Sequence, residues 1–573
     1  MPSKSIHNSM ITKPKYILLG ILLLGALLRL TLISLGDPLT DEVLYAFRAI
    51  GPLDFDEAVE QTTPLEWLDP NIPFWTNLSF HDHPPLVFWI EHVSIKIFGE
   101  NNFAMRFPSA LLGVASIYLL YLLVRKLSSE KAALLAALFL AVTINHVYIS
   151  RSGIQEPFVI FFLLLTSYLF LKSFEKDSYL IWTGLSAGLM FLTKYTTFFL
   201  IPVFLIYTAF SKRDLFKNKK LYIGAILAIL IFSPVIIYNY ELYKTFGHFD
   251  FQFSFMAGQH PDVWKVTPGK EIGALKDRIL NFIPNAYLSN SWIFLSLSLL
   301  ALLAYVYALL RKPAEVFNKH PFLALSFLFL ILMILKIGPS FRFLTMSTPF
   351  LAAGLGIFLA NISDRYSSQK KITLAVLSLM ILFEIFYSIN SQILYSPLGK
   401  KIWLFSELRY ENNNWGYNEL GQYMKNELNG KMPALAFESR YKFIEKIQEK
   451  AFEDGQKKNL KEYPTLILYD NRIQAAAQLW ILDRLHIYHG WPIIKIDQYF
   501  QFLAQNGPDY FQKSGFKNYY FIMPTDKVPW KHEKALTDAG IKFEAELVKN
   551  KIKPISIKNK SGKEAFRVYK FEN

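Results

Sequence analysis

Residues 16–35 read YILLGILLLGALLRLTLISL, and residues 36–45 continue with GDPLTDEVLY. The first part is an apolar run of membrane-spanning length. It is too long for the core of a signal peptide and lacks a small-residue cleavage site, so it predicts a retained membrane helix. The second part places Asp41 and Glu42 where that helix emerges into water. A solvated helix end and a functional pair of carboxylates are both open interpretations of these two residues.

The composition agrees with a membrane protein. The chain has 573 residues, 52% of them hydrophobic and 50 of them Phe, and a mean hydropathy of +0.23. Its net charge of +15 comes largely from Lys and Arg in short loops and in the C-terminal part, and no nucleic-acid motif accompanies it, so no nucleic-acid partner is expected. The absence of cysteine excludes disulfides, thiolate metal sites and a cysteine nucleophile.

The hydropathy pattern predicts a polytopic α-helical membrane protein with about eleven spans in the lipid bilayer. The predicted spans are residues 16–35, 103–124, 132–150, 158–171, 179–192, 198–210, 221–240, 287–310, 321–335, 343–360 and 372–387. Lys4, Lys13 and Lys15 precede the first span and indicate a cytoplasmic N-terminus. The basic stretch 212–220 is a second cytoplasmic marker, so residues 36–102 and 241–284 become external loops.

The soluble parts have their own patterns. The stretch Pro84–Phe98 in the first external loop is amphipathic and predicts a helix lying along the membrane surface. After residue 392 the chain becomes charged and Tyr-rich, which predicts two domains, 1–392 and 393–573. The predicted strands are Thr465–Tyr469, Tyr519–Met523 and Ala565–Phe571, and the predicted helices are Tyr417–Leu428, Ala475–Leu485 and Lys534–Ala539. These elements predict a C-terminal soluble α/β domain, which the odd span count places outside the cytoplasm.

Ionisable residues gather on the predicted external face. They are Asp41, Glu42, His81, Asp82, His83, Glu156, Lys194, His260, Lys265 and Arg342. Such groups are costly near an apolar slab and usually have a partner or a function. A sheltered carboxylate such as Asp41, assisted by Glu156, is suited to accept a proton from a hydroxyl group. Neighbouring cations are suited to a phosphate, so the pattern favours group transfer from a lipid phosphate over ion transport.

Several short motifs resemble a known family. They are Asp41-Glu42 with Tyr45, His83-Pro84-Pro85-Leu86, the stretch RFPSALLG at 106–113, Leu192-Thr193-Lys194, and Arg342-Phe343-Leu344 with Pro349. In this order they are similar to the C-type glycosyltransferases related to protein O-mannosyltransferases and to the bacterial aminoarabinose transferase of lipid A. The resemblance covers roughly residues 16–390. It implies an inverting enzyme that takes its sugar from a polyprenyl phosphate and transfers it to a protein, lipid or glycan acceptor.

The resemblance also implies roles for single residues. Asp41 becomes the residue that activates the acceptor, with Glu156 at the family's second acidic position and Glu42 beside Asp41. His83 and Lys265 fall at positions that hold the donor phosphate, and Leu44 stands where the aminoarabinose enzyme has an Arg. The matching metal positions are Asp82 and His260, which imply a zinc or manganese ion. Lys194 and Arg342 are the further candidates for binding the phosphate.

Other interpretations stay open at this stage. His83 could have only a structural role before the Pro-Pro turn. Lys194 could extend its amine to the membrane interface. Two protein ligands make an incomplete metal site. If no metal takes part, cationic side chains must stabilise the leaving phosphate. A transporter or flippase of lipid-linked sugars is the alternative function, although no internal repeat is evident. An inactive scaffold is a third interpretation, which the presence of Asp41 disfavours.

Overall fold

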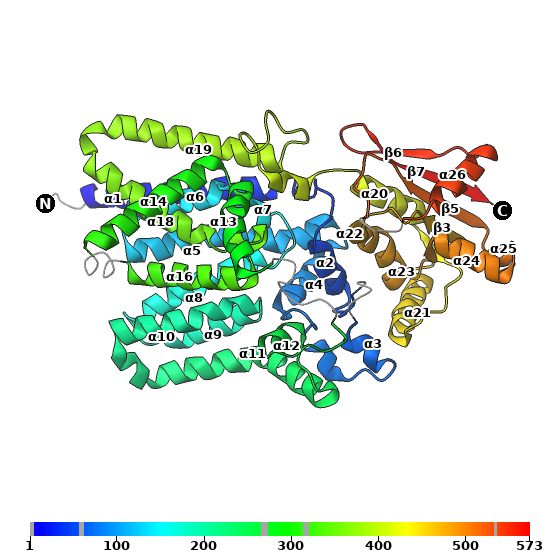
Figure 1. Cartoon of the computed structure of the whole chain (residues 1–573), viewed down its shortest axis with the longest axis horizontal. Helices are drawn as coiled ribbons and strands as arrows, with labels where there is room; N and C mark the ends of the chain where they lie inside the picture. The colour runs from blue at the N-terminus through cyan, green and yellow to red at the C-terminus, as the bar shows by residue number, and fades with distance from the viewer. Residues whose placement is uncertain (1–4, 57–61, 265–272, 313–319, 532–535, 573) are drawn as a thin grey trace. The chain divides into compact units, whose positions relative to one another are not determined.

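The computed structural model describes residues 5–56, 62–264, 273–312, 320–531 and 536–572 (Figure 1). The chain forms two compact units. Unit 1 comprises Met1–Ile33, Glu57–Thr62 and Phe74–Tyr410, and unit 2 comprises Ser34–Asp56, Thr63–Pro73 and Glu411–Asn573. The predicted division at residue 392 stays a prediction. In the observed units, the two segments 34–56 and 63–73 group with the C-terminal residues.

Unit 1 is helical. Its helices are α1 (Ser5–Leu30), α4 (Leu86–Phe98), α5 (Asn102–Leu127), α6 (Glu130–Val142), α7 (Ile144–Ile149), α8 (Glu156–Ser173), α9 (Tyr179–Phe191), α10 (Leu200–Ser211), α11 (Lys219–Phe246), α12 (Phe251–Met256), α13 (Leu275–Ser289), α14 (Trp292–Arg311), α16 (Pro321–Ile337), α17 (Phe341–Thr345), α18 (Thr348–Arg365) and α19 (Lys370–Gln392). The short turns η1 (Phe74–Asn77) and η2 (Tyr195–Phe199) also belong to it.

The apolar helices of unit 1 make the chain a polytopic membrane protein. Among the described residues, 6 helical stretches are long and apolar enough to cross a membrane, and three shorter apolar helices accompany them. The helices α5, α6, α8, α9 and α11 lie side by side, as Figure 1 shows. The total of about eleven spans and their orientation stay predictions.

Several predicted spans differ from the observed helices: α1 ends at Leu30, before the predicted end at residue 35, and the span 343–360 is divided between α17 and α18. The span 132–150 is wrong as a single helix, because Thr143 has ψ 126° and separates α6 from α7. The Thr143 hydroxyl donates to the Phe139 carbonyl at 2.7 Å, a local bond that competes with continuation of the helix. The predicted start at residue 287 is also wrong, because α13 runs to Ser289 and α14 begins at Trp292.

Two contacts explain how the helices of unit 1 pack. A Cβ built at Gly184 of α9 would overlap the backbone of Gly224 of α11, so glycine permits this close approach. At the end of α1, the buried Arg151 guanidinium donates to the carbonyls of Leu28 at 2.9 Å, Thr31 at 2.8 Å and Leu32 at 3.1 Å. These carbonyls lie in the last helical turn and just beyond it, where acceptors lack helical partners. A distant arginine therefore completes the end of α1.

Unit 2 contains a mixed sheet in the order β4-β3-β5-β7-β6. The strands are β3 (Thr465–Tyr469), β4 (Ile493–Lys495), β5 (Asn518–Pro524), β6 (Ile555–Lys558) and β7 (Glu564–Glu572), with β1 (Lys431–Pro433) and β2 (Lys461–Tyr463) in a separate parallel pair. The strand β3 is parallel to β4 and β5, whereas β7 is antiparallel to β5 and β6. The three predicted strands lie inside β3, β5 and β7.

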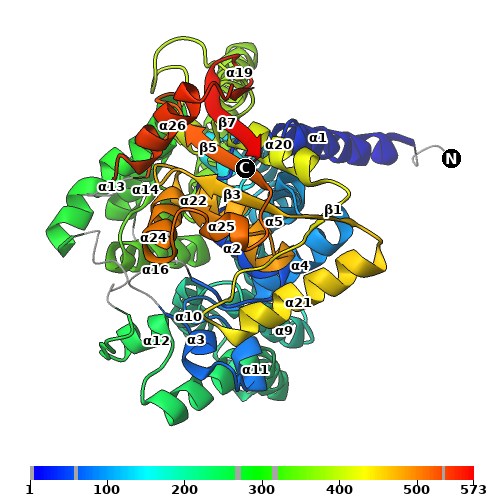
Figure 2. The same ribbon diagram turned by 90° about the vertical axis from the view of Figure 1, so that its right-hand side faces the viewer.

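Helices cover the sheet of unit 2. They are α20 (Tyr417–Leu428), α21 (Lys442–Lys457), α22 (Ala475–Gln478), the π-helical turn η7 (Leu479–Asp483), α23 (Arg484–His489), α24 (Ile496–Asn506), α25 (Tyr510–Lys513) and α26 (Ala539–Lys549). An aromatic core joins β3 and β5 to α24, α25 and α26, and Figure 2 shows α24 and α26 beside these strands. The predicted helix 534–539 is wrong, because 536–538 is not helical and α26 starts at Ala539. There the Thr537 hydroxyl bonds to Asp497, which holds this turn outside the helix.

Candidate functional site

A buried ion pair lies at the start of α8. Glu156 is the first residue of this helix, and one of its carboxylate oxygens accepts from the Lys194 ammonium at 2.8 Å. The Glu156 side chain is fully buried and that of Lys194 is 11% exposed. Among the residues that the structure describes, none forms a hydrogen bond with the second Glu156 oxygen, Oε2, or with the amide atoms of the neighbouring Gln155. Buried polar atoms of this kind usually bind water or a ligand.

Two further residues surround this pair. The Lys194 ammonium lies 4.7 Å from the centre of the Phe343 ring in α17, a cation–π contact. The adjacent Arg342 lies within Coulombic range of the Glu156 carboxylate. The structure thus brings together Glu156, Lys194 and Arg342, which the sequence places far apart. Their assignment to catalysis and to phosphate binding stays a prediction.

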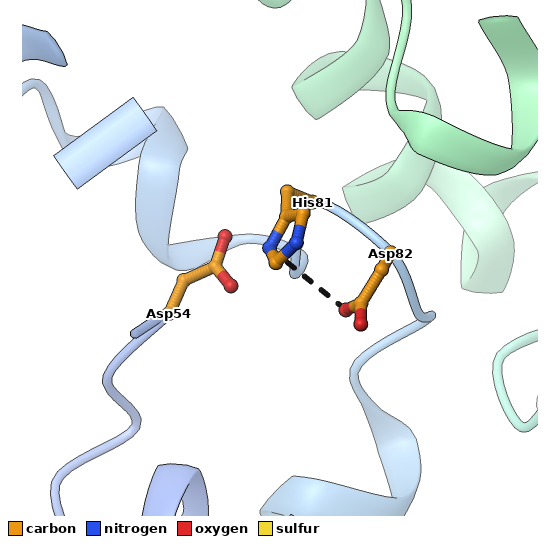
Figure 3. Close-up of side chains that lie close together, drawn as sticks. All are labelled: Asp54, His81 and Asp82. Atoms are coloured by element: carbon orange, nitrogen blue, oxygen red, sulfur yellow. Dashed lines mark ion pairs between the residues drawn. The ribbon is translucent and has the colours of Figure 1, made fainter. Parts of the chain in front are cut away.

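A second polar cluster lies in the turn before α4. The Asp82 carboxylate lies 3.0 Å from Nδ1 of His83 and 3.9 Å from Nδ1 of His81. Figure 3 shows the His81–Asp82 pair, drawn with Asp54, a residue of unit 2. The His81 side chain is fully buried, and that of His83 is 19% exposed. His81 and Asp82 offer an imidazole nitrogen and a carboxylate oxygen within 4.8 Å of each other, a pair of donors suited to zinc or manganese.

Two further residues are predicted to bind the metal or the phosphate, His260 and Lys265. His260 is an exposed residue of the loop after α12. Its pairing with Asp82 at a metal stays a prediction, and His81 is a candidate ligand that the sequence analysis did not assign. Lys265, predicted to bind phosphate, lies outside the described residues.

The sequence analysis also missed a buried network around Asp250. Its carboxylate accepts from the Tyr195 hydroxyl at 2.8 Å, from the Asn239 amide at 3.0 Å and from the Phe253 N–H at 2.7 Å. Burial raises the pKa of Asp250 to about 6, while these hydrogen bonds oppose the rise. The next residue, Phe251, donates its N–H to the His81 carbonyl at 2.8 Å. The Asp250 network therefore holds the backbone of the turn before α4 at His81.

Asp41 and Glu42 belong to unit 2. Asp41 is exposed and is the N-cap residue of α2 (Glu42–Ile50), and Glu42 is buried. The helix α2 packs against α22 and η7, and the Tyr488 hydroxyl of α23 donates to the Phe47 carbonyl at 2.8 Å. The candidate base is thus presented on a helix held by the C-terminal part of the chain. Its cooperation with Glu156 stays a prediction.

Asp37 is a further residue that the sequence analysis did not select. It is fully buried, and its carboxylate accepts hydrogen bonds from the backbone N–H groups of residues 415–418, which lead into α20. Burial raises the pKa of Asp37 to about 6, and the backbone hydrogen bonds oppose the rise. The only sequence signal was its position after the first apolar run.

Three comparisons place the chain among known proteins. The family model of dolichyl-phosphate-mannose-protein mannosyltransferases matches residues 82–238. An uncharacterized protein of Aquifex aeolicus (strain VF5) is 30% identical over 318 residues, covering 55% of this chain and 68% of that protein. The putative mannosyltransferase YkcB of Bacillus subtilis (strain 168) is 32% identical over 153 residues, covering 26% of this chain and 21% of YkcB. The chain spans less than half the length of several curated relatives that it matches.

A solved structure shares the fold. The crystal structure of ArnT from Cupriavidus metallidurans bound to undecaprenyl phosphate superposes with a TM-score of 0.50 at 13% identity, covering 98% of both chains. Together with the apolar helices and the buried ionic cluster, this likeness defines a polytopic membrane protein with the architecture of C-type glycosyltransferases. The chain belongs to the family of the dolichyl-phosphate-mannose-protein mannosyltransferases.

Proposed function

We propose that this protein is an integral-membrane inverting glycosyltransferase. It takes a sugar from a polyprenyl-phosphate donor and transfers it to a hydroxyl group of a protein, lipid or envelope glycan on the external face. The observation that carries the proposal is the buried Glu156–Lys194 pair beside Arg342, which lies in a chain of this family. A buried acid with two cations is suited to a substrate that carries a phosphate.

The proposed reaction is a single displacement. The acceptor hydroxyl gives its proton to the Asp41 carboxylate while its oxygen forms a bond to the anomeric carbon. The bond between that carbon and the phosphate oxygen breaks, and the polyprenyl phosphate leaves with the electron pair. Attack opposite the leaving group inverts the anomeric carbon. Lys194, Arg342, His83 and Lys265 are the proposed groups that stabilise the developing phosphate charge.

A divalent ion at Asp82 would act on the same charge when bound, because a metal ion stabilises phosphate oxygens electrostatically. The residues that would hold it are Asp82, His81 and, from the family resemblance, His260. Lys194 and Arg342 are the cations through which the proposed reaction stabilises the leaving phosphate. The proposed reaction therefore does not depend on the ion.

Transfer is tested with the purified chain in detergent or vesicles. Polyprenyl-phosphate sugars of several kinds are supplied with extracted envelope lipids and proteins, and mass spectrometry follows both the free polyprenyl phosphate and any product heavier by one sugar. We expect both products to appear together. Movement of intact donor across the vesicle membrane without cleavage would instead establish the transporter alternative, and the absence of both results would contradict the proposal.

A further inference from the structure

We infer that the C-terminal part of unit 2 positions Asp41, and that Asp37 is the residue through which it does so. The inference rests on the proposed function, in which Asp41 takes the proton of the acceptor. It assigns a role to residues 411–573, in which the sequence analysis found no catalytic group. Asp37 is then a positioning residue.

The first support is the hydrogen bonding of Asp37. Oδ2 accepts from the backbone N–H groups of residues 415, 416 and 417 at 2.7, 2.9 and 3.0 Å, and Oδ1 accepts from that of Asn418 at 2.9 Å. The Asp37 N–H donates to the Asn413 carbonyl at 2.9 Å. The first N–H groups of a helix lack helical partners and attract negative charge, so a carboxylate is well suited to this position. Few side chains offer two oxygens for four such donors.

The same junction is also held from the opposite side. The side-chain amide of Asn418 donates to the carbonyls of Ser34 at 3.3 Å, Leu35 at 3.1 Å and Gly36 at 3.2 Å. The backbone immediately before Asp37 is therefore bound to the same helical turn as the Asp37 carboxylate. Four consecutive residues, 34–37, have their place set by residues 413–418.

The turn that receives Asp37 has a specific shape. Gly416 has φ +123°, a conformation that side chains disfavour, and a Cβ built there would overlap the Cβ of Ala565 in β7. Tyr417, the next residue, is fully buried and its ring lies 5.0 Å from that of Phe566. The N–H groups that bind Asp37 are thus built on the sheet of unit 2, which makes them a rigid attachment.

A second attachment follows Asp41. The helix α2 is buried along nearly its whole length, packs on α22 and η7, and contacts Tyr488 through Phe47 at a ring distance of 5.1 Å. Between the two attachments, Pro38 restricts the backbone and the Gln474 amide approaches the Leu39 carbonyl at 3.5 Å. Asp41 is exposed while the chain on both sides of it is fixed. Such fixing matters because a misplacement of about 1 Å can cost roughly 10²-fold in rate.

The test removes the charge of Asp37. Asp37→Asn keeps the size of the side chain but leaves one oxygen for the four N–H donors. We expect kcat to fall roughly 10- to 100-fold with an unchanged KM for the donor, because only the geometry of Asp41 changes. In an Asp41→Asn background the same substitution should cause no further loss, because residues that act through one group are not additive.

Asp69→Asn is the matched control. The Asp69 carboxylate comes from the segment 63–73 of unit 2 and accepts from the N–H groups at the start of α21, those of Lys442 at 2.6 Å and Phe443 at 3.0 Å. Asp69 caps a helix in the same manner, but it is not close to Asp41 in the sequence. We expect Asp69→Asn to leave kcat within about twofold and to show no coupling with Asp41→Asn.

Asn418→Ala covers the case in which Asp37→Asn does not fold. It removes the contacts to 34–36 from the partly buried face of α20 and should lower kcat in the same coupled manner. The inference is overturned if either folded variant keeps full kcat, or if its loss multiplies with that of Asp41→Asn. Failure of the proposed function is separate, because it appears as an inactive wild-type protein with every donor.

Discussion

The Lys194 ammonium lies 2.8 Å from the Glu156 carboxylate, and both side chains are buried. An isolated charge in such surroundings is costly, so removing one partner alone is destabilising. The pair joins the start of α8 to the turn η2 that follows α9, and Phe343 covers the ammonium. The contribution of this pair to stability and activity can be tested by substituting each partner.

Lys194→Met should destabilise the protein by about 3–5 kcal/mol, because it leaves Glu156 buried without its cation. The double variant Glu156→Gln with Lys194→Met should recover most of that stability but no transfer activity. Unfolding in detergent and transfer are measured on the same preparations. Lys172→Met is the control. The Lys172 ammonium lies 2.9 Å from the carboxylate of Glu175, whose side chain is exposed, and exposed pairs of this kind contribute at most about 1 kcal/mol to stability. Equal effects of the two Lys substitutions would contradict the prediction.

Asp41→Asn should lower turnover by roughly 10²- to 10⁴-fold while donor binding and the unfolding temperature stay unchanged, because it removes a proton acceptor without changing size. Turnover and binding of a polyprenyl phosphate are measured separately. Asp526→Asn is the control, since Asp526 is exposed and pairs with Lys527. If Asp41→Asn retains near-normal turnover, Asp41 is not the base, and Glu156 becomes the residue to substitute.

Exhaustive chelation should leave turnover largely unchanged. In the proposed reaction the charges of Lys194 and Arg342 stabilise the leaving phosphate, and no step requires an ion. The measurement compares initial rates before chelation, after chelation, and after addition of zinc or manganese. Complete inhibition that either metal reverses would show that an ion is required, and His260→Ala should then raise the concentration needed for recovery.

Asp250 should make the protein more stable at pH 5 than at pH 7. Its folded-state pKa of about 6 lies above the ordinary value of 3.8, so the folded state binds the proton more tightly, and stability is lost as the pH rises through that interval. Between pH 5 and pH 7 the loss of stability amounts to roughly 1 kcal/mol, out of about 3 kcal/mol over the whole interval from below pH 3.8 to above pH 6. Unfolding temperatures at both pH values check this. Asp250→Asn has no carboxyl group to titrate, so it should reduce the pH dependence, and an unchanged dependence would assign it to other groups.

The predicted orientation is tested with topology reporters. A reporter fused after Asn573 should be external, and one inserted in the basic loop at 212–220 should be cytoplasmic, because positively charged loops stay inside. Both fusions are compared with a reporter at the N-terminus, which should also be cytoplasmic. A cytoplasmic signal from the C-terminal fusion would mean that the number of spans is even.

The sequence by itself determined the apolar helices and several strands of the soluble part. The predicted strand Thr465–Tyr469 has the same bounds as β3, and the predicted helix Tyr417–Leu428 has those of α20. These features follow from the hydropathy and residue preferences of near neighbours in the chain, so they can be predicted from short stretches of sequence. Family motifs also identified Glu156 and Lys194 as polar residues of interest.

Only the tertiary structure decided which groups meet. Glu156 pairs with a lysine 38 residues away, and Asp37 binds backbone N–H groups 378 to 381 residues away. The break at Thr143 and the late start of α26 likewise depend on hydrogen bonds that hydropathy does not record. A partner is chosen by the packing of whole helices and sheets, and a backbone N–H has no sequence signature. The attachment of Asp37 to residues 415–418 is therefore visible only in the folded chain.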